Sequence, residues 1–272
     1  MKKIGIIGCG TIGSELAKTI DKSKINATLI CIFDEYLNTA NKLANELKTK
    51  VIVSTTIDEF LSCDIDFVVE SASQEAVRKY TKIVLEHDLD IMIMSIGALL
   101  EGSLYDELIN ISEQHDVKIY LPTGAIAGID AIRSVKHMLS EVTLTTTKNP
   151  RSFEGAPFFL KNKIDLKKIK KLTTIYEGKA IEAVKLFPTN VNVAAILSLA
   201  GIGRNNTKVR ILADPKSIMN THEIIVKGKF GEMYFQIKNF PSPSNPKTSY
   251  LAVLSAIECL RSICDNRVNI GT

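Results

Sequence analysis

The sequence has no long hydrophobic run and no paired cysteine motif, and each absence excludes a class of protein. No stretch approaches the roughly 18 uncharged apolar residues that a membrane span requires. The apolar run after Met1 is interrupted at once by glycines, which does not fit a signal peptide. The five cysteines are odd in number and form no CxxC pair, so they suit a reducing compartment better than a disulfide framework. We therefore expect a soluble, cytoplasmic protein.

Metal-ligand and strongly charged patterns are also missing. The chain has no HExxH spacing and no paired CxxC, so we expect no metal site. The net charge of +4 is mild, and the densest basic run, at 163–172, indicates the solvated face of a short amphipathic helix rather than a nucleic-acid site. The remaining composition is that of a globular protein, since 45% of the 272 residues are hydrophobic.

The chain opens as a strand, a glycine turn and a helix. The apolar run KKIGIIG predicts a buried parallel strand, and Gly8, Gly10 and Gly13 follow in GxGxxG spacing. In this motif the first glycine permits a tight turn, the second lets a pyrophosphate approach the backbone, and the third lets the helix pack closely on the strand. The free N–H groups at the start of the helix, at Thr11 and Ile12, are expected to bind the phosphates.

A second apolar strand, ATLICIFDEY, contains the next candidate. It ends at Asp34, 21 residues beyond Gly13, about where an acidic group binds the adenosine ribose hydroxyls. Asp34 would repel a 2′-phosphate, and no Arg or Lys follows it within several residues. The sequence therefore favours NAD over NADP, with NADP use left open. The alternative is a glycine turn followed by an exposed aspartate without a nucleotide.

Strands and helices keep alternating up to residue 125. Six strands with intervening helices predict an α/β fold with a doubly wound parallel sheet, the Rossmann arrangement. Ligands of such sheets bind beyond the carboxyl ends of the strands, and small residues dominate the predicted ends here. Ser71 and Ala72 are therefore candidate cofactor contacts. His87 and His115 fall at helix ends on the opposite edge, where we expect exposed caps.

The pattern changes in the second half of the chain. EVTLTTTK alternates as a half-exposed strand, KVRILADP, HEIIVKGKF and EMYFQIKN follow at hairpin-like intervals, and two helical segments lie between them. This predicts a second, α+β domain with a largely antiparallel sheet. We expect domains at 1–125 and 126–245, with 246–272 as a helix that packs back on the first. A large sheet face of this kind often packs against a second copy, so we expect a homodimer or higher oligomer.

The final helix, TSYLAVLSAIECLRS, has two possible roles at its start. Asn245 is expected to cap it, with Pro246 at the first helical position. Lys247 and Thr248 would then form an anion site if they face a cleft, or they are simply a good helix start.

Two histidines belong to the second domain. His137 lies in a predicted helix among apolar and basic neighbours, which favours a structural role. Strand alternation places His222 on one face with Ile224 and Val226. Such a histidine is either a satisfied core side chain or an imidazole that accepts a proton as hydride leaves a substrate. Asn190, where a helix begins, either caps that helix or reaches the carboxamide of a cofactor.

Four segments together resemble the L-aspartate dehydrogenases: GIIGCGTIG, FPTNVNVAAILSLAG, NTHEI and PSPSNPKTSYLAVLSAIECLR. The resemblance covers essentially the whole chain in the order of the family. That family joins a Rossmann domain to an α/β domain that dimerises, and it oxidatively deaminates L-aspartate with NAD or NADP. The resemblance implies that His222 is the catalytic histidine and that Ala125 and Asn190 contact the cofactor.

The implied reaction removes hydride from Cα of L-aspartate and gives iminoaspartate. Water then releases ammonia and oxaloacetate, unless the imine passes on to quinolinate synthesis in NAD production. His222 would act as general base, and Arg204 and Lys247 are candidates to hold the two substrate carboxylates. Two alternatives stay open: a reductase resembling dihydrodipicolinate reductase or homoserine dehydrogenase, and a non-catalytic NAD-sensing protein.

Overall fold

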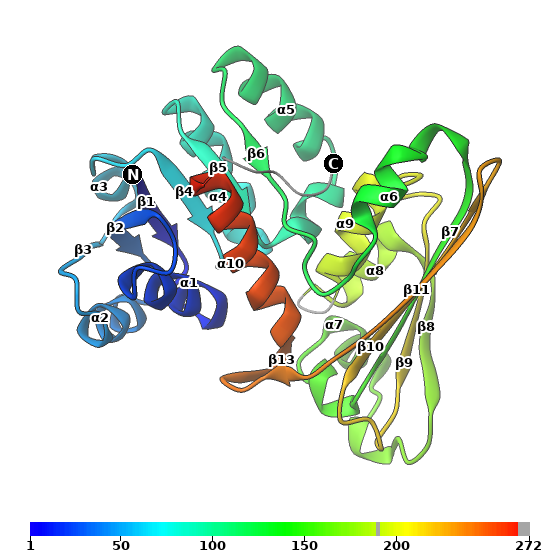
Figure 1. Ribbon diagram of the computed structural model, residues 1–272. Helices are drawn as coiled ribbons and strands as arrows, with labels where there is room; N and C mark the ends of the chain where they lie inside the picture. The colour runs from blue at the N-terminus through cyan, green and yellow to red at the C-terminus, as the bar shows by residue number, and fades with distance from the viewer. Residues whose placement is uncertain (189–190, 266–272) are drawn as a thin grey trace. The chain divides into compact units, whose positions relative to one another are not determined.

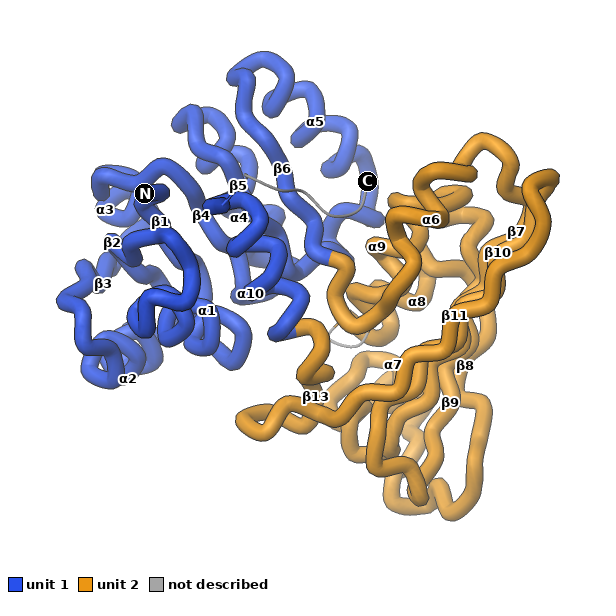
Figure 2. The backbone as a smooth tube through the Cα atoms, in the orientation of Figure 1, with its two compact units in different colours: residues 1–122, 253–269 blue, residues 123–252, 270–272 orange. Residues whose placement is uncertain are grey.

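The computed structural model describes residues 1–188 and 191–265 (Figure 1). They form two compact units, which Figure 2 shows in separate colours. Unit 1 comprises Met1–Pro122 together with the described residues from Val253 onward. Unit 2 comprises Thr123–Ala252. Among the described residues, no helix combines the length and apolar character needed to cross a membrane.

Unit 1 contains a six-stranded sheet in the order β3-β2-β1-β4-β5-β6, and its strand pairs are all parallel. The sheet order reverses between β1 and β4, which is the topological switch point where doubly wound sheets bind ligands. The predicted Rossmann sheet is therefore confirmed. The strands are β1 Lys2–Ile7, β2 Ala27–Phe33, β3 Ile52–Ser54, β4 Phe67–Glu70, β5 Asp90–Ile93 and β6 Ile119–Tyr120.

Two helices of unit 1 begin at side-chain caps. Thr56 and Ser73 accept hydrogen bonds from amides three residues on and so begin α3 and α4. His87 and His115 cap the C-terminal ends of α4 and α5, the predicted positions. The helices are α1 Thr11–Asp21, α2 Leu37–Glu46, α3 Ile57–Leu61, α4 Gln74–Glu86 and α5 Leu104–Gln114, with the 3₁₀ helix η1 Ile96–Leu100.

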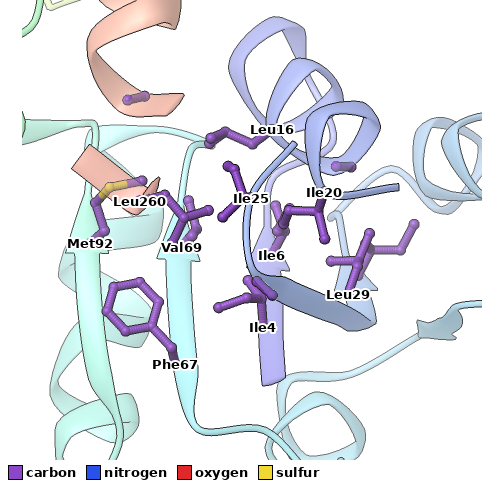
Figure 3. Packing of buried hydrophobic residues seen from close by; sticks show 14 of the residues in the cluster. Ile4, Ile6, Leu16, Ile20, Ile25, Leu29, Phe67, Val69, Met92 and Leu260 are labelled. Atoms are coloured by element: carbon purple, nitrogen blue, oxygen red, sulfur yellow. The ribbon is translucent and has the colours of Figure 1, made fainter. Parts of the chain in front are cut away.

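The core of unit 1 includes a helix from the far end of the sequence. Helix α10, Tyr250–Cys264, contributes Ala256 and Leu260 to the cluster built on β1 and β4. Figure 3 shows Leu260 beside Val69 and Met92. Because a fully buried leucine contributes about 1.5–3 kcal/mol, this helix is an integral part of the unit.

The predicted start of that helix is wrong. Asn245–Ser249 is strand β13, which pairs antiparallel with β12, Pro241–Ser242, and the helix begins only at Tyr250. The Asn245 side chain accepts a hydrogen bond from the amide of Lys247, two residues on. Asparagine uses this contact to make turns as well as to cap helices, and the local sequence does not distinguish the two.

Unit 2 is built on a five-stranded sheet in the order β11-β10-β7-β9-β8. Only the β7–β9 pair is parallel, so the sheet is largely antiparallel, as predicted. Figure 1 shows the long strands β7, β10 and β11 running together. The strands are β7 Leu139–Lys148, β8 Thr173–Lys179, β9 Lys208–Ala213, β10 Asn220–Gly228 and β11 Gly231–Asn239, and the helices are α6 Ile129–Ser134, α7 Pro157–Asn162, α8 Ala180–Leu186 and α9 Asn192–Ala200.

The basic run at 163–172 does not form the predicted amphipathic helix. It contains only the 3₁₀ turn η4, Leu166–Lys168, where Asp165 accepts a hydrogen bond from the amide of Lys167. The helix is absent because its apolar residues find little to pack against: Leu166 and Ile169 are half-buried and the rest are exposed. Helices in proteins depend mainly on such packing.

Candidate active site

The glycine turn of unit 1 has the geometry that a dinucleotide requires. Gly8 has φ of +95°, and a Cβ there would lie 2.6 Å from the backbone of Ala72. At Gly13 a Cβ would lie 1.9 Å from the Gly8 carbonyl oxygen, whereas at Gly10 it would meet no atom within 4 Å. The outer two positions therefore tolerate only glycine, and Gly10 borders open space at the start of α1.

That open space belongs to a cleft of about 190 Å³ at the carboxyl ends of β1, β2 and β4. The cleft brings together five of the predicted cofactor contacts: Gly8, Gly10, Asp34, Ser71 and Ala72. Thr11, Ile12 and Gly13 form the first turn of α1, where amide groups have no partner within the helix. The cradle therefore fits a nucleotide pyrophosphate at a helix N-terminus.

Two side chains hold the shape of this cleft. One oxygen of Asp34 accepts a 2.8 Å hydrogen bond from the amide of Cys9, and the other accepts one from the amide of Tyr36. The Ser71 hydroxyl donates to the Gly8 carbonyl at 2.8 Å. Asp34 and Ser71 thus line the cleft and also secure the glycine turn.

Glu70 joins the ends of two neighbouring strands. Its buried carboxylate accepts hydrogen bonds from the amides of Ala72, Ser73 and Ser95 and from the Ser95 hydroxyl. Burial raises the pKa of Glu70, while the four donors act in the opposite direction. The carboxylate fixes the loop after β4, which forms one wall of the cleft.

The sheet of unit 2 changes from apolar to polar along its covered face. Val142 and Leu144 of β7 lie opposite Val226 and Ile224 of β10, and these four side chains are buried. Further along the same face, Thr146 of β7 pairs with His222 of β10, and the next residues of these strands on this face are Lys148 and Asn220. All four are also buried. We call these last four residues the polar strip.

His222 has a polarised environment within the polar strip. Its Nδ1 lies 3.0 Å from the Thr146 hydroxyl oxygen, and its Nε2 is buried without a hydrogen-bond partner among the described residues. Burial and, secondarily, the charge of Lys148 lower the pKa of His222 to about 3. The imidazole is therefore neutral at pH 7.

Lys148 was not predicted from the sequence as a site residue. It is only 4% exposed, and burial lowers the pKa of its ammonium group to about 8. The signal was present in the alternation of VTLTTTK, which places Lys148 in register with buried Val142 and Leu144. A lysine on the buried face of a strand is uncommon enough to mark a site candidate.

The predicted substrate residues occupy different parts of unit 2. The side-chain amide of Asn220 donates to the Ser249 hydroxyl, so strand β13 contacts the polar strip. On β13, Lys247 is exposed and Thr248 is half-buried. Arg204 lies in the turn before β9, and that strand begins opposite Thr143, away from the Lys148 end of β7.

The two predicted cofactor contacts outside unit 1 have separate outcomes. Ala125 lies in unit 2, where it is buried just before α6. Asn190 lies outside the described residues. The roles of both stay predictions.

Fold and site together indicate a class of protein. Unit 1 carries a dinucleotide cradle, and unit 2 carries a neutral, buried imidazole beside a lysine. Residues 8–122 match the family described as homoserine dehydrogenase, NAD-binding domain, and residues 130–263 match the one described as aspartate dehydrogenase, C-terminal. The class is that of NAD(P)-dependent oxidoreductases with a Rossmann domain.

Known relatives make the assignment more specific. The chain is 47% identical to an L-aspartate dehydrogenase of Nitrosopumilus maritimus and 49% identical to one of Methanosarcina barkeri, over 100% of both chains in each case. The chain belongs to the L-aspartate dehydrogenase family. A crystal structure of aspartate dehydrogenase from Thermotoga maritima has a TM-score of 0.77 to it at 26% identity, again over 100% of both chains.

Proposed function

We propose that His222 is the general base in an NAD(P)-dependent oxidation of L-aspartate. The reaction follows from family membership. The observation that supports the role of His222 is its buried Nε2, which has no hydrogen-bond partner in the described part of the chain. For Nε2 to accept a proton, Nδ1 carries the ring hydrogen and donates it to the Thr146 hydroxyl, which is 3.0 Å away. Thr146 thereby selects the reactive tautomer.

Each step has a defined proton and electron balance. NAD(P), when bound, accepts the hydride from Cα of the substrate. The lone pair of the deprotonated substrate amine then forms the C=N bond of iminoaspartate, and His222 takes the proton that the amine or the attacking water releases. Addition of water and loss of ammonia give oxaloacetate. We propose, as the alternative fate, that the imine is passed on to quinolinate synthesis before it is hydrolysed.

The cofactor proposal is NAD, with NADP as a second substrate. The carboxylate of Asp34 in the cleft favours ribose hydroxyls over a 2′-phosphate. However, Lys79 of α4 lines the same cleft. It lies 45 positions beyond Asp34 in the sequence, so the residues that directly follow Asp34 do not indicate it. Lys79 supplies a cation that supports NADP binding.

We also propose a homodimer formed through the open face of the unit 2 sheet. Side chains that point away from the polar strip include Thr145 and Ile225, both half-buried, and the exposed Tyr234, whose hydroxyl donates to Glu223. The same face of a second copy would cover Ile225 and Tyr234. We expect Ile225→Lys to disrupt the dimer, which light scattering measures. The five free cysteines support a reducing, cytoplasmic location.

The decisive experiment measures NADH or NADPH formation at 340 nm with L-aspartate. We expect turnover by the wild-type protein and a loss of about 10²–10⁴-fold in His222→Ala, the usual contribution of a general base. His137→Ala is the matched control, since His137 is an exposed histidine of the same unit and its loss should leave the rate within a factor of about two.

The outcomes separate the two parts of the proposal. Absence of turnover by the wild-type protein with either cofactor would reject the reaction. Undiminished turnover by His222→Ala would reject only the role of the histidine.

A further inference from the structure

We propose that Lys148 binds a carboxylate of the substrate and holds it beside His222. The inference rests on the proposed aspartate reaction and assigns one of its substrate contacts. It replaces neither Arg204 nor Lys247 as a candidate for the second carboxylate. Three observations carry it: the strand register, the burial of the ammonium group and the electrostatic link to His222.

The register of three strands brings Lys148 close to the imidazole. His222 lies opposite Thr146, and Lys148 follows Thr146 two residues further along the same face of β7. Lys148 and His222 are therefore diagonal neighbours, a relation that places Cα atoms about 7–8 Å apart and within reach of long side chains. On its other side Lys148 pairs with Ala213 of β9, a residue with a small side chain.

The ammonium group is held in surroundings that suit an incoming anion. Lys148 is 4% exposed, and Ala213, which pairs with it from β9, is uncharged. The low local dielectric of a buried site screens charges less than water does, so an anion is attracted there more strongly than at the surface. A substrate carboxylate therefore gains more from Lys148 than from an exposed lysine.

The same cation controls the base. Burial is the main cause of the low pKa of His222 in the free protein, and the charge of Lys148 lowers it further, so the imidazole is neutral before substrate arrives. When a carboxylate neutralises Lys148, this contribution is cancelled and the pKa of His222 rises. Substrate binding thus makes Nε2 a stronger base at the moment when a proton must be accepted.

Succinate is the probe for binding, because it has both carboxylates of aspartate but no amine and no hydride to give. We expect calorimetry on the full chain to show that Lys148→Met weakens succinate binding at least about tenfold, as loss of a charge-assisted hydrogen bond does. The KM for L-aspartate should rise by a similar factor, with a smaller change in kcat. Lys148→Arg should recover part of the affinity.

Lys238→Met is the matched control, since Lys238 is an exposed lysine of β11 in the same sheet. It should bind succinate as the wild-type protein does. NADH binding, which reports on unit 1, should be equal in all variants and so shows that each is folded. Succinate binding by a folded Lys148→Met at wild-type strength would overturn the inference.

A pH series on the wild-type protein keeps the inference testable if Lys148→Met does not fold. Binding of a carboxylate requires the charged lysine, so succinate affinity should fall as the pH rises through about 8, the pKa of Lys148. The fall should approach tenfold per pH unit. His222 is the titratable group that faces Lys148 from β10, and it stays neutral in this pH range. Ala213, which faces Lys148 from β9, does not titrate, and neither do Ser249 of β13 and the residues of α9.

A flat profile, or no succinate binding by the wild-type protein, would overturn the role of Lys148. If succinate binding depends on Lys148 but L-aspartate is not oxidised, the proposed function fails while the carboxylate site stands. The two failures are thus distinguishable.

Discussion

The nucleotide cleft of unit 1 and the polar strip of unit 2 use different parts of the polypeptide. In the cleft the groups available to a ligand are mainly backbone: a glycine turn, the first amides of α1 and the loop that Glu70 holds. In the polar strip the candidate groups are side chains of two paired strands, above all His222 and Lys148. A cofactor that many enzymes share suits a backbone cradle, whereas discrimination between substrates requires side chains.

The comparison predicts the largest effect for a methyl group inside the backbone cradle. In Gly13→Ala the new Cβ would meet the Gly8 carbonyl at 1.9 Å, and a backbone atom cannot swing aside. We expect a loss of stability beyond the roughly 1–3 kcal/mol of ordinary overpacking, with loss of NADH binding. Denaturant unfolding and NADH fluorescence measure the two quantities.

Gly10→Ala is the matched control, because its Cβ enters open space. Stability should change by less than about 0.5 kcal/mol, while NADH binding weakens because the methyl group occupies space beside the pyrophosphate. Equal stability of the two variants would show that the cradle is more pliable than its geometry indicates.

A smaller effect is expected for the carboxylate that supports the cradle. In Glu70→Gln one of the two acceptor oxygens becomes an NH₂ group, which then faces amide donors. We expect a loss of about 1.5–3 kcal/mol in unfolding free energy, together with weaker NADH binding. Glu113→Gln, at an exposed position of α5 in the same unit, should alter neither quantity. A neutral result for Glu70→Gln would remove its supporting role.

The polar strip should reveal itself through the pH dependence of stability. The pKa of His222 is lowered from 6.5 to about 3, so its neutral form stabilises the fold fully above pH 6.5, and this stability is lost as the pH falls toward 3. Between pH 6.5 and 5 the expected loss is about 2 kcal/mol. Over this interval the unfolding free energy of His222→Gln, measured by urea unfolding, should lack this loss of about 2 kcal/mol. That of His87→Gln, at an exposed helix end, should follow the wild-type protein. Parallel curves for His222→Gln and wild type would contradict a buried, neutral imidazole.

The predictability of the two regions follows the same division. The glycine turn could be predicted because Gly8, Gly10 and Gly13 encode its backbone conformation within six residues. The face of His222 could also be predicted, because alternation along one strand is a local property. Lys148 could not be placed beside it, since their strands pair across more than 70 residues of sequence.

Local sequence gave wrong predictions where the same residues are compatible with two kinds of structure. Asn245 has the same side-chain hydrogen bond in a turn as in a helix cap, so only the pairing of β13 with β12 decided between them. The basic run at 163–172 failed as a helix for a comparable reason, because its apolar residues gained too little burial from the rest of the fold.

The inclusion of α10 in unit 1 has a consequence for the order in which the protein folds. Leu260 packs in one core with Ile4 and Ile6, so these contacts join residues more than 250 positions apart in the sequence. During synthesis the nucleotide-binding unit cannot complete its core until the intervening residues 123–252, which belong to unit 2, have been translated.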